Sequence, residues 1–270
     1  MNLLCKLSLA ICFFISYTAN AKPQYANAES KEVIEKMIKA HGGYENWKNA
    51  PSIRFDSVMH DNYHKKDSFA WWTAHEVIDQ KTRQAYQNWP MDKAQIGYDG
   101  KKVWSKNWNK GNPPEFMIHF FYYFVNLPWL TQDDNVILSK VTHFTWPGLN
   151  KEFYEIKMSF SEAPSMGKSA KDYFVLYIDP ETYLLAGYQY ANGYEPLLEL
   201  MGIKGKYEVF GPLWRIITKY DNVDGLIFPA AFRTMPEANE RIVGNHLILN
   251  IAIDKPFDYD KAHNPDNKSQ

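Results

Sequence analysis

The stretch PPEFMIHFFYYFVNLPWL, residues Pro113–Leu130, is the only long aromatic run with helical spacing in a chain that otherwise alternates as strands do. Pro113 and Pro114 suit the first turn of a helix, because that turn lacks an internal partner for the missing N–H. Pro128 stands where a proline ring would end the helix. The stretch therefore predicts one helix, and we expect it to lie inside a curved sheet.

Apolar side chains cover nearly every face of this helix. One face, at three- and four-residue spacing, carries Phe116, Phe120, Phe124 and Leu127, and the other faces carry Phe121, Tyr122, Tyr123 and Val125. Such a helix either spans a membrane or lies in a large core, and this one is short and contains His119 and Asn126. We predict burial, either with an apolar cavity between helix and sheet or with a filled core.

The composition indicates a folded chain with a large core. Of its 270 residues, 45% are hydrophobic and 16% are aromatic. The formal net charge is −1, so no basic field exists to attract nucleic acid or an anionic membrane surface. We expect no nucleic-acid partner.

The N-terminus has the pattern of a secretory signal peptide over residues 1–21. Lys6 precedes an apolar run over 7–17, and Ala19, Asn20 and Ala21 form a small-x-small cleavage site. The mature chain is expected to begin at Lys22 and to be periplasmic or secreted.

The alternative at the N-terminus is lipidation at Cys12, which a bulky Ile11 before the cysteine disfavours. Cys5 and Cys12 both lie in the signal, so the mature chain has no thiol for a disulfide, a nucleophile or a metal. No later segment offers about 18 consecutive apolar residues, so no stable membrane span is expected.

A second, amphipathic helix is predicted over residues 29–41. Ser30 is the expected cap and Gly42 with Gly43 the stop, and Trp47 follows as a packing residue. At the C-terminus of this helix, the dipole would favour a protonated His41.

From Ser52 onward the apolar period changes to two, which predicts strands. Turns at Asp99-Gly100, at residues 179–182 and at Asp224-Gly225 indicate hairpins. We expect one face of the sheet packed and the other wet, with Leu247, Leu249, Ile251 and Ile253 alternating inward. The predicted strands cover 53–58, 68–78, 83–89, 94–98, 102–108, 136–146 (as one strand or a pair of short strands), 153–160, 173–178, 183–190, 207–220, 226–234 and 242–253.

The order of elements predicts an α+β fold with a single antiparallel sheet of roughly ten or more strands. We find no internal repeat and no linker that would divide the chain, so one domain is expected over residues 22–260. The segment from Asp254 is polar and is expected to be loose, ending in a tail over 261–270.

The sequence contains no recognisable set of catalytic residues. His60-x-x-x-His64 would need a helix to bring both imidazoles together, and Asp133-Asp134 is more typical of a solvated loop than of a cation site. The sequence has no Gly-x-Ser-x-Gly elbow, phosphate loop or dinucleotide fingerprint. We expect no cofactor and no metal, and a non-enzymatic protein is favoured over a hydrolase whose residues converge only in space.

Short motifs in a fixed order resemble the LolA-like group of bacterial envelope proteins, and more narrowly an uncharacterised family of secreted bacterial proteins. These motifs are Ala40-His41-Gly42-Gly43 with Trp47, Tyr98-Asp99-Gly100, residues 126–130 (NLPWL), residues 177–182 (YIDPET) and residues 224–229 (DGLIFP). The resemblance implies an open half-barrel that wraps the central helix and holds acyl chains of lipoproteins or other lipids beneath the sheet.

We therefore expect a binding protein for an apolar small molecule or a lipidated protein. The alternatives are a carbohydrate-binding or sensory module that uses exposed tryptophan and tyrosine, and the hydrolase named above. The expected ligand-binding residues, between the sheet and the central helix, are Trp71, Phe116, Phe120, Phe124, Trp129, Tyr154, Ile156 and Met158.

Overall fold

The computed structural model describes most of the chain beyond the predicted signal peptide, and residues 1–21 and 266–270 lie outside it. None of the helices it describes is long and apolar enough to cross a membrane. The described residues are 22–61, 70–109, 111–147, 149–163, 169–200, 202, 209–236 and 242–265.

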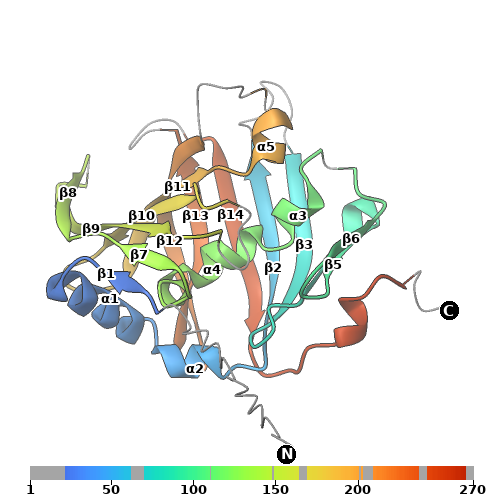
Figure 1. The fold of residues 1–270 in the computed structure, drawn as a ribbon, viewed down its shortest axis with the longest axis horizontal. Coiled ribbons are helices and arrows are strands. Elements are labelled where there is room, and N and C mark those ends of the chain that lie inside the picture. Colours follow the sequence, from blue (N-terminus) through green and yellow to red (C-terminus); the bar gives the residue numbers. More distant parts are fainter. Residues whose placement is uncertain are drawn as a thin grey trace, which may run out of the picture.

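One sheet of 14 strands makes up most of the molecule (Figure 1). The strands are β1 (Gln24–Tyr25), β2 (Ser52–Asp61), β3 (Ala70–Asp79), β4 (Ala85–Trp89), β5 (Ala94–Tyr98), β6 (Val103–Lys106), β7 (Val136–Leu138), β8 (Thr142–Trp146), β9 (Lys151–Phe160), β10 (Tyr173–Ile178), β11 (Leu185–Asn192), β12 (Phe210–Val223), β13 (Leu226–Met235) and β14 (Gly244–Ala252).

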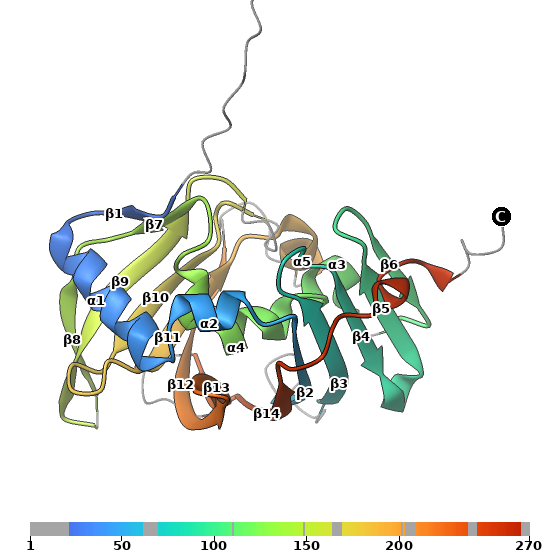
Figure 2. The same cartoon turned by 90° about the horizontal axis from the view of Figure 1, so that it is seen from below.

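The sheet is open and almost entirely antiparallel. From edge to edge the strands follow the order β1, β7, β9, β10, β11, β12, β13, β14, β2, β3, β4, β5, β6, and β8 pairs with β9 beside this path. Only β1 and β7 run parallel among the described pairs. The sheet curves around a central helix, which lies on its concave face (Figures 1 and 2). The predicted α+β half-barrel is confirmed.

The central helix is broken, where one continuous helix was predicted. α3 (Pro114–Met117) ends before His119, whose φ of −123° leaves the helical region, and α4 (Phe120–Leu130) then begins. Pro128 lies inside α4 and does not end it. A proline costs one backbone hydrogen bond, and the burial of every α4 residue from 121 to 130 outweighs that loss.

The apolar residues predicted for β14 are divided between the two faces, and Ile251 and Ile253 pack against the main core. Leu247 and Leu249 point outward and are 44% and 40% exposed, whereas His246 and Ile248 are buried. An irregularity in the pairing with β2 follows Leu249, and Asn250 there adopts a φ of 54°. The leucines alternate as expected, but the sheet turns their face to the convex side.

The sequence predicted that the convex face would be exposed to water, but part of this face is buried. Trp146 of β8 and Tyr177 of β10 are fully buried there, and the Tyr177 ring stacks on Trp214 of β12 with centroids 5.3 Å apart. Although β8 pairs with β9, its Phe144 reaches across the face to contact both Tyr177 and Trp214. A second, smaller apolar cluster therefore backs the main core.

The N-terminal helix α1 (Ala28–Ala40) is confirmed, but its cap is Asn27 and not the predicted Ser30. Asn27 accepts a hydrogen bond from the Ser30 N–H, and the Ser30 side chain completes a capping box. The short helix α2 (Tyr44–Lys48) follows and carries the buried Trp47. Both helices lie at the lower end of the half-barrel (Figure 1).

His41, between α1 and α2, joins the helices to the sheet. Its Nδ1 donates to the Ile227 carbonyl at 2.6 Å, and its Nε2 accepts from the Leu185 N–H at 3.0 Å. Burial lowers the pKa of His41 to about 4, so the expected protonated imidazole is instead neutral. At the adjacent Gly42, a Cβ would lie 2.2 Å from the Gly225 carbonyl oxygen, so no other residue fits this close approach.

The C-terminal segment is docked as far as Ala262, where a loose segment was predicted from residue 254. Ser52 and Arg54 of β2 donate to the carbonyls of Lys255 and Pro256. Trp104 donates to the Ala262 carbonyl at 2.7 Å. The segment is held through its backbone carbonyls. The polarity of its side chains therefore could not predict that it is docked.

The neutral His41 predicts a loss of stability in acid. The unfolded chain binds a proton on this imidazole below its ordinary pKa of 6.5, and the folded chain excludes that proton until the pH approaches 4. Between about pH 7 and pH 4, the native chain should lose up to roughly 3 kcal/mol more unfolding free energy than the His41→Gln variant. Denaturant titrations at several pH values measure the difference.

His143→Gln is the matched control, since His143 is exposed on β8. Its unfolding free energy should follow the native curve. Parallel pH curves for the native chain and His41→Gln would contradict the assignment of a buried neutral imidazole.

Candidate functional site

Three phenylalanines form an aromatic ladder along α3 and α4. The ring centroids of Phe116 and Phe120 are 4.9 Å apart, and those of Phe120 and Phe124 are 4.5 Å apart. Phe124 is only 1% exposed, whereas Phe116 and Phe120 are half-buried. Phe116 also stacks on Tyr194, which precedes α5 (Glu195–Leu200). The ladder thus runs from the core to the surface beside α5.

The break between α3 and α4 is held by a buried glutamine on β4. Gln87 Nε2 donates to the carbonyls of Met117 and Ile118, at 2.9 and 3.1 Å, and to Glu76 Oε2. A helix end leaves carbonyls without internal partners, and buried ones need hydrogen bonds from elsewhere. Gln87 supplies them and so fixes the angle at which the ladder leaves the core.

Glu76 of β3 is a second buried polar group on this concave wall. It is 2% exposed, and Ser57 Oγ lies 2.6 Å from its Oε1. Burial raises the pKa of Glu76 to about 8, although the hydrogen bonds of Ser57 and Gln87 lower it in part. The carboxyl group is therefore protonated at neutral pH, and the wall carries no negative charge there.

Beneath Phe124 the wall holds a buried cation. The Arg215 guanidinium of β12 lies 4.3 Å from the centroid of the Phe124 ring and is 4% exposed. The His246 ring of β14 lies 6.3 Å from the Phe124 ring, and burial followed by the charge of Arg215 holds the pKa of this imidazole well below its usual range. The part of the wall beneath Phe124 therefore combines aromatic rings with the buried positive charge of Arg215.

The far end of α4 is closed by stacked tryptophans. Trp47 of α2 lies nearly parallel to Trp129, with centroids 5.8 Å apart, and its Nε1 donates to Asn126 Oδ1 at 2.7 Å. Trp129 Nε1 donates to the Gly43 carbonyl. The ladder therefore has one open end, at Phe116 and Phe120.

The residues predicted to bind ligand fall into separate groups. Phe116, Phe120 and Phe124 come together in the ladder, whereas Trp129 lies at the closed end of α4. Ile156 and Met158 of β9 are fully buried in the main core, and Tyr154 packs on its edge against Tyr183. Trp71 lies in β3, and its side chain is outside the described residues. Their role in binding stays a prediction.

The polar candidates from the sequence do not converge. His60 lies in β2, and His64 is outside the described residues. Asp133 pairs with Arg83 at 3.3 Å, so one member of the Asp133-Asp134 pair serves an ion pair. In the described part of the chain, no group of three or more His, Cys, Asp or Glu side chains could hold a metal ion.

Sequence reasoning missed the buried polar residues of the wall, Glu76, Gln87, Arg215 and His246. A signal for two of them exists. Arg215 shares a strand face with Ile217, and His246 shares one with Ile248, so alternation alone places both inside. Because both side chains are polar, the sequence instead suggested that Arg215 and His246 face the solvent.

No protein-family model matches the sequence, and no curated protein matches it. Several solved structures are similar to this chain. A DUF1329 family protein from Desulfovibrio piger is similar over 88% of this chain and 98% of its own, with a TM-score of 0.54 and 11% identity. A LolA superfamily protein from Nitrosomonas europaea is similar over 89% and 100%, with a TM-score of 0.52 and 7% identity. This chain has a LolA-like fold. At such low identities the LolA-like likeness concerns the fold alone.

The protonated Glu76 predicts that the LolA-like domain loses stability as the pH rises. Its ordinary pKa of 4.5 applies to the unfolded chain, so between about pH 5 and pH 8 only the unfolded carboxyl ionises freely. Glu76→Gln mimics the protonated group, with its amide placed to donate to Ser57 and its carbonyl placed to accept from Gln87. Over that range the native chain should lose up to about 4 kcal/mol relative to this variant.

Denaturant titrations across this range check the result, with the exposed Glu45→Gln as the control. An equal pH slope for the native chain and Glu76→Gln would show that Glu76 is ionised in the folded state.

Proposed function

We propose that the protein binds an apolar ligand, an alkyl chain of a lipid or a lipidated protein, at the open end of the aromatic ladder. The observation that carries this proposal is the half-buried pair Phe116 and Phe120, which continues without a gap into the buried Phe124. Each methylene group that leaves water for such a surface contributes about 0.8 kcal/mol.

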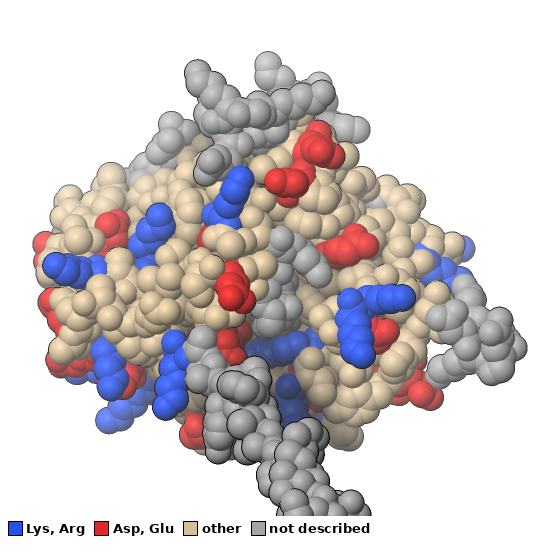
Figure 3. Space-filling view, in the orientation of Figure 1, with Lys and Arg blue, Asp and Glu red and all other residues tan. Residues whose placement is uncertain are grey.

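The surroundings of the ladder support this placement. α5 lies at the upper end of the half-barrel (Figure 1) and turns Leu197 and Leu198 inward, while Leu200 is 53% exposed. Acidic and basic side chains are interspersed over the face shown in Figure 3, with no broad field of one sign that would recruit a charged polymer. Apolar contact is the attraction that the described residues of the ladder offer.

The LolA-like fold supports the same function, because the resemblance in the sequence implies acyl-chain binding beneath such a sheet. The proposed location is the periplasm or the exterior of the cell, on the basis of the signal pattern over residues 1–21. The proposed action is binding without chemical conversion, and the residues of the ladder offer neither a nucleophile nor a base.

Neutral alkanols of increasing chain length test the proposal. They should displace the fluorescent apolar probe N-phenyl-1-naphthylamine, and affinity should rise roughly three- to fourfold with each added methylene. Phe116→Gln and Phe120→Gln should each weaken binding by about tenfold or more, because a polar amide replaces apolar contact area.

Phe144→Gln is the matched control, since Phe144 is also half-buried but lies on the convex face. It should leave alkanol binding unchanged. An affinity independent of chain length, or an equal loss in all three variants, would refute the ladder as the binding site.

A further inference from the structure

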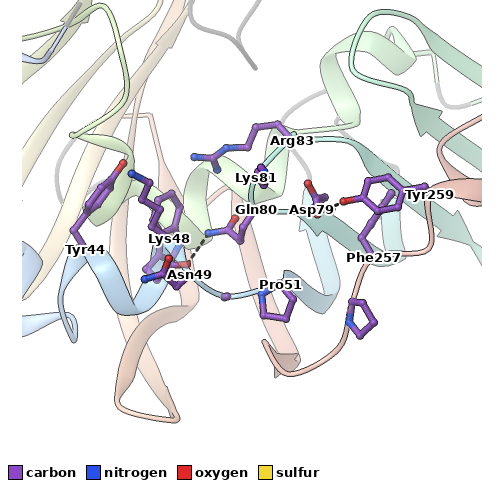
Figure 4. A pocket seen from close by; sticks show the side chains of 13 residues that line it. Tyr44, Lys48, Asn49, Pro51, Asp79, Gln80, Lys81, Arg83, Phe257 and Tyr259 are labelled. Atoms are coloured by element: carbon purple, nitrogen blue, oxygen red, sulfur yellow. Dashed lines mark hydrogen bonds between the residues drawn. The ribbon is translucent and has the colours of Figure 1, made fainter. Parts of the chain in front are cut away.

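A hollow of about 630 Å³ lies at the lower end of the molecule, away from the open end of the ladder (Figure 4). It is bounded by α2, by the turn between β3 and β4, and by the docked C-terminal segment. The volume falls in the range of sites for small molecules. None of the residues predicted from the sequence to bind ligand lines it.

Aromatic rings form two opposed walls of this hollow. Tyr44 of α2 stands on one side, and Phe257 and Tyr259 of the C-terminal segment stand on the other (Figure 4). The rings of Phe257 and Tyr259 meet edge to face at 5.2 Å. The exposed Tyr259 offers a surface on which a flat or ring-shaped body can pack.

Hydrogen bonds to buried residues hold the base of the hollow. Gln80 Nε2 donates to the Trp47 carbonyl at 3.0 Å, and Gln80 Oε1 accepts from Tyr122 of α4 at 2.6 Å. Trp47 in turn bonds Asn126 and stacks on Trp129. The hollow is therefore built on the buried contacts of α4, so its shape is set before a ligand arrives.

The charges around the hollow favour an anion. Lys48, Lys81 and Arg83 line it, and among the described lining residues Asp79 is the one that is acidic. Arg83 is balanced by Asp133, at 3.3 Å. Among the residues that the structure describes, neither Lys48 nor Lys81 forms an ion pair.

The Asp79 carboxylate is already used within the chain. Its Oδ2 accepts from the N–H and the hydroxyl of Thr82, and its Oδ1 accepts from the Tyr259 hydroxyl at 3.0 Å. These bonds hold Tyr259 against the turn. With Asp79 and Arg83 each bonded within the chain, Lys48 and Lys81 give the site its net positive charge.

We propose that this hollow binds a small carboxylate carried on a ring, with the ring against Tyr259 and the carboxylate at Lys48 and Lys81. The lysines attract the charge as exposed partners, and the aromatic walls select the ring. This site is separate from the alkyl-chain site, and the proposal does not depend on alkyl-chain binding.

Two pairs of probes test the proposal by calorimetric titration of the whole mature chain: glucuronate with glucose, and benzoate with benzamide. In at least one pair, the carboxylate should bind roughly tenfold or more tightly than its neutral partner, and added salt should weaken it. A preference for glucuronate identifies a sugar acid as the natural class, and a preference for benzoate an aromatic acid.

The variants locate the site. Lys48→Gln combined with Lys81→Gln should weaken the carboxylate by about five- to tenfold, and Tyr259→Leu by a similar factor. Lys39→Gln, an exposed lysine of α1 outside the hollow, should have no effect. Because Lys48 and Lys81 are exposed, their replacement should leave the thermal midpoint unchanged. Equal binding of both members of each pair, or no loss in the double variant, would overturn the proposal.

Discussion

The structure depends on the enclosure of one helix that is apolar on every side. A helix of this kind cannot lie on the surface of a sheet with one face in water, because each exposed phenylalanine or tyrosine would leave a large apolar area hydrated. The 14-stranded sheet curves around α4, and α1 and α2 cover its lower end. The curvature of the sheet follows from this requirement.

Buried hydrogen bonds then fix the position of the helix within its enclosure. Gln87 holds the carbonyls at the break before α4, Asn126 binds Trp47 in the middle, and Trp129 binds the Gly43 carbonyl near the end. A buried donor or acceptor without a partner costs about 1–3 kcal/mol, so such bonds specify one orientation among many that apolar packing would allow. These hydrogen bonds also set the geometry of the aromatic ladder and of the lower hollow.

The sequence predicted the enclosed helix, the strands and the hairpins, because each depends on local spacing. It predicted a single helix and missed the break at His119, which is stabilised by Gln87 more than thirty residues away in another strand. It also placed Leu247 and Leu249 inside, since alternation defines two faces but does not say which one the sheet turns inward. The lower hollow could not be foreseen, because its walls come from α2, the β3–β4 turn and the C-terminal segment.

Amide hydrogen exchange of α4 tests the enclosure most directly. If the curved sheet holds this helix inside the molecule, the amides of residues 123–127, 129 and 130 should exchange only through global unfolding, as slowly as those in the paired centre of β12 and β13. Exchange of these α4 amides at the rates of exposed turns would contradict the central claim, because a helix that opens freely to water is not enclosed.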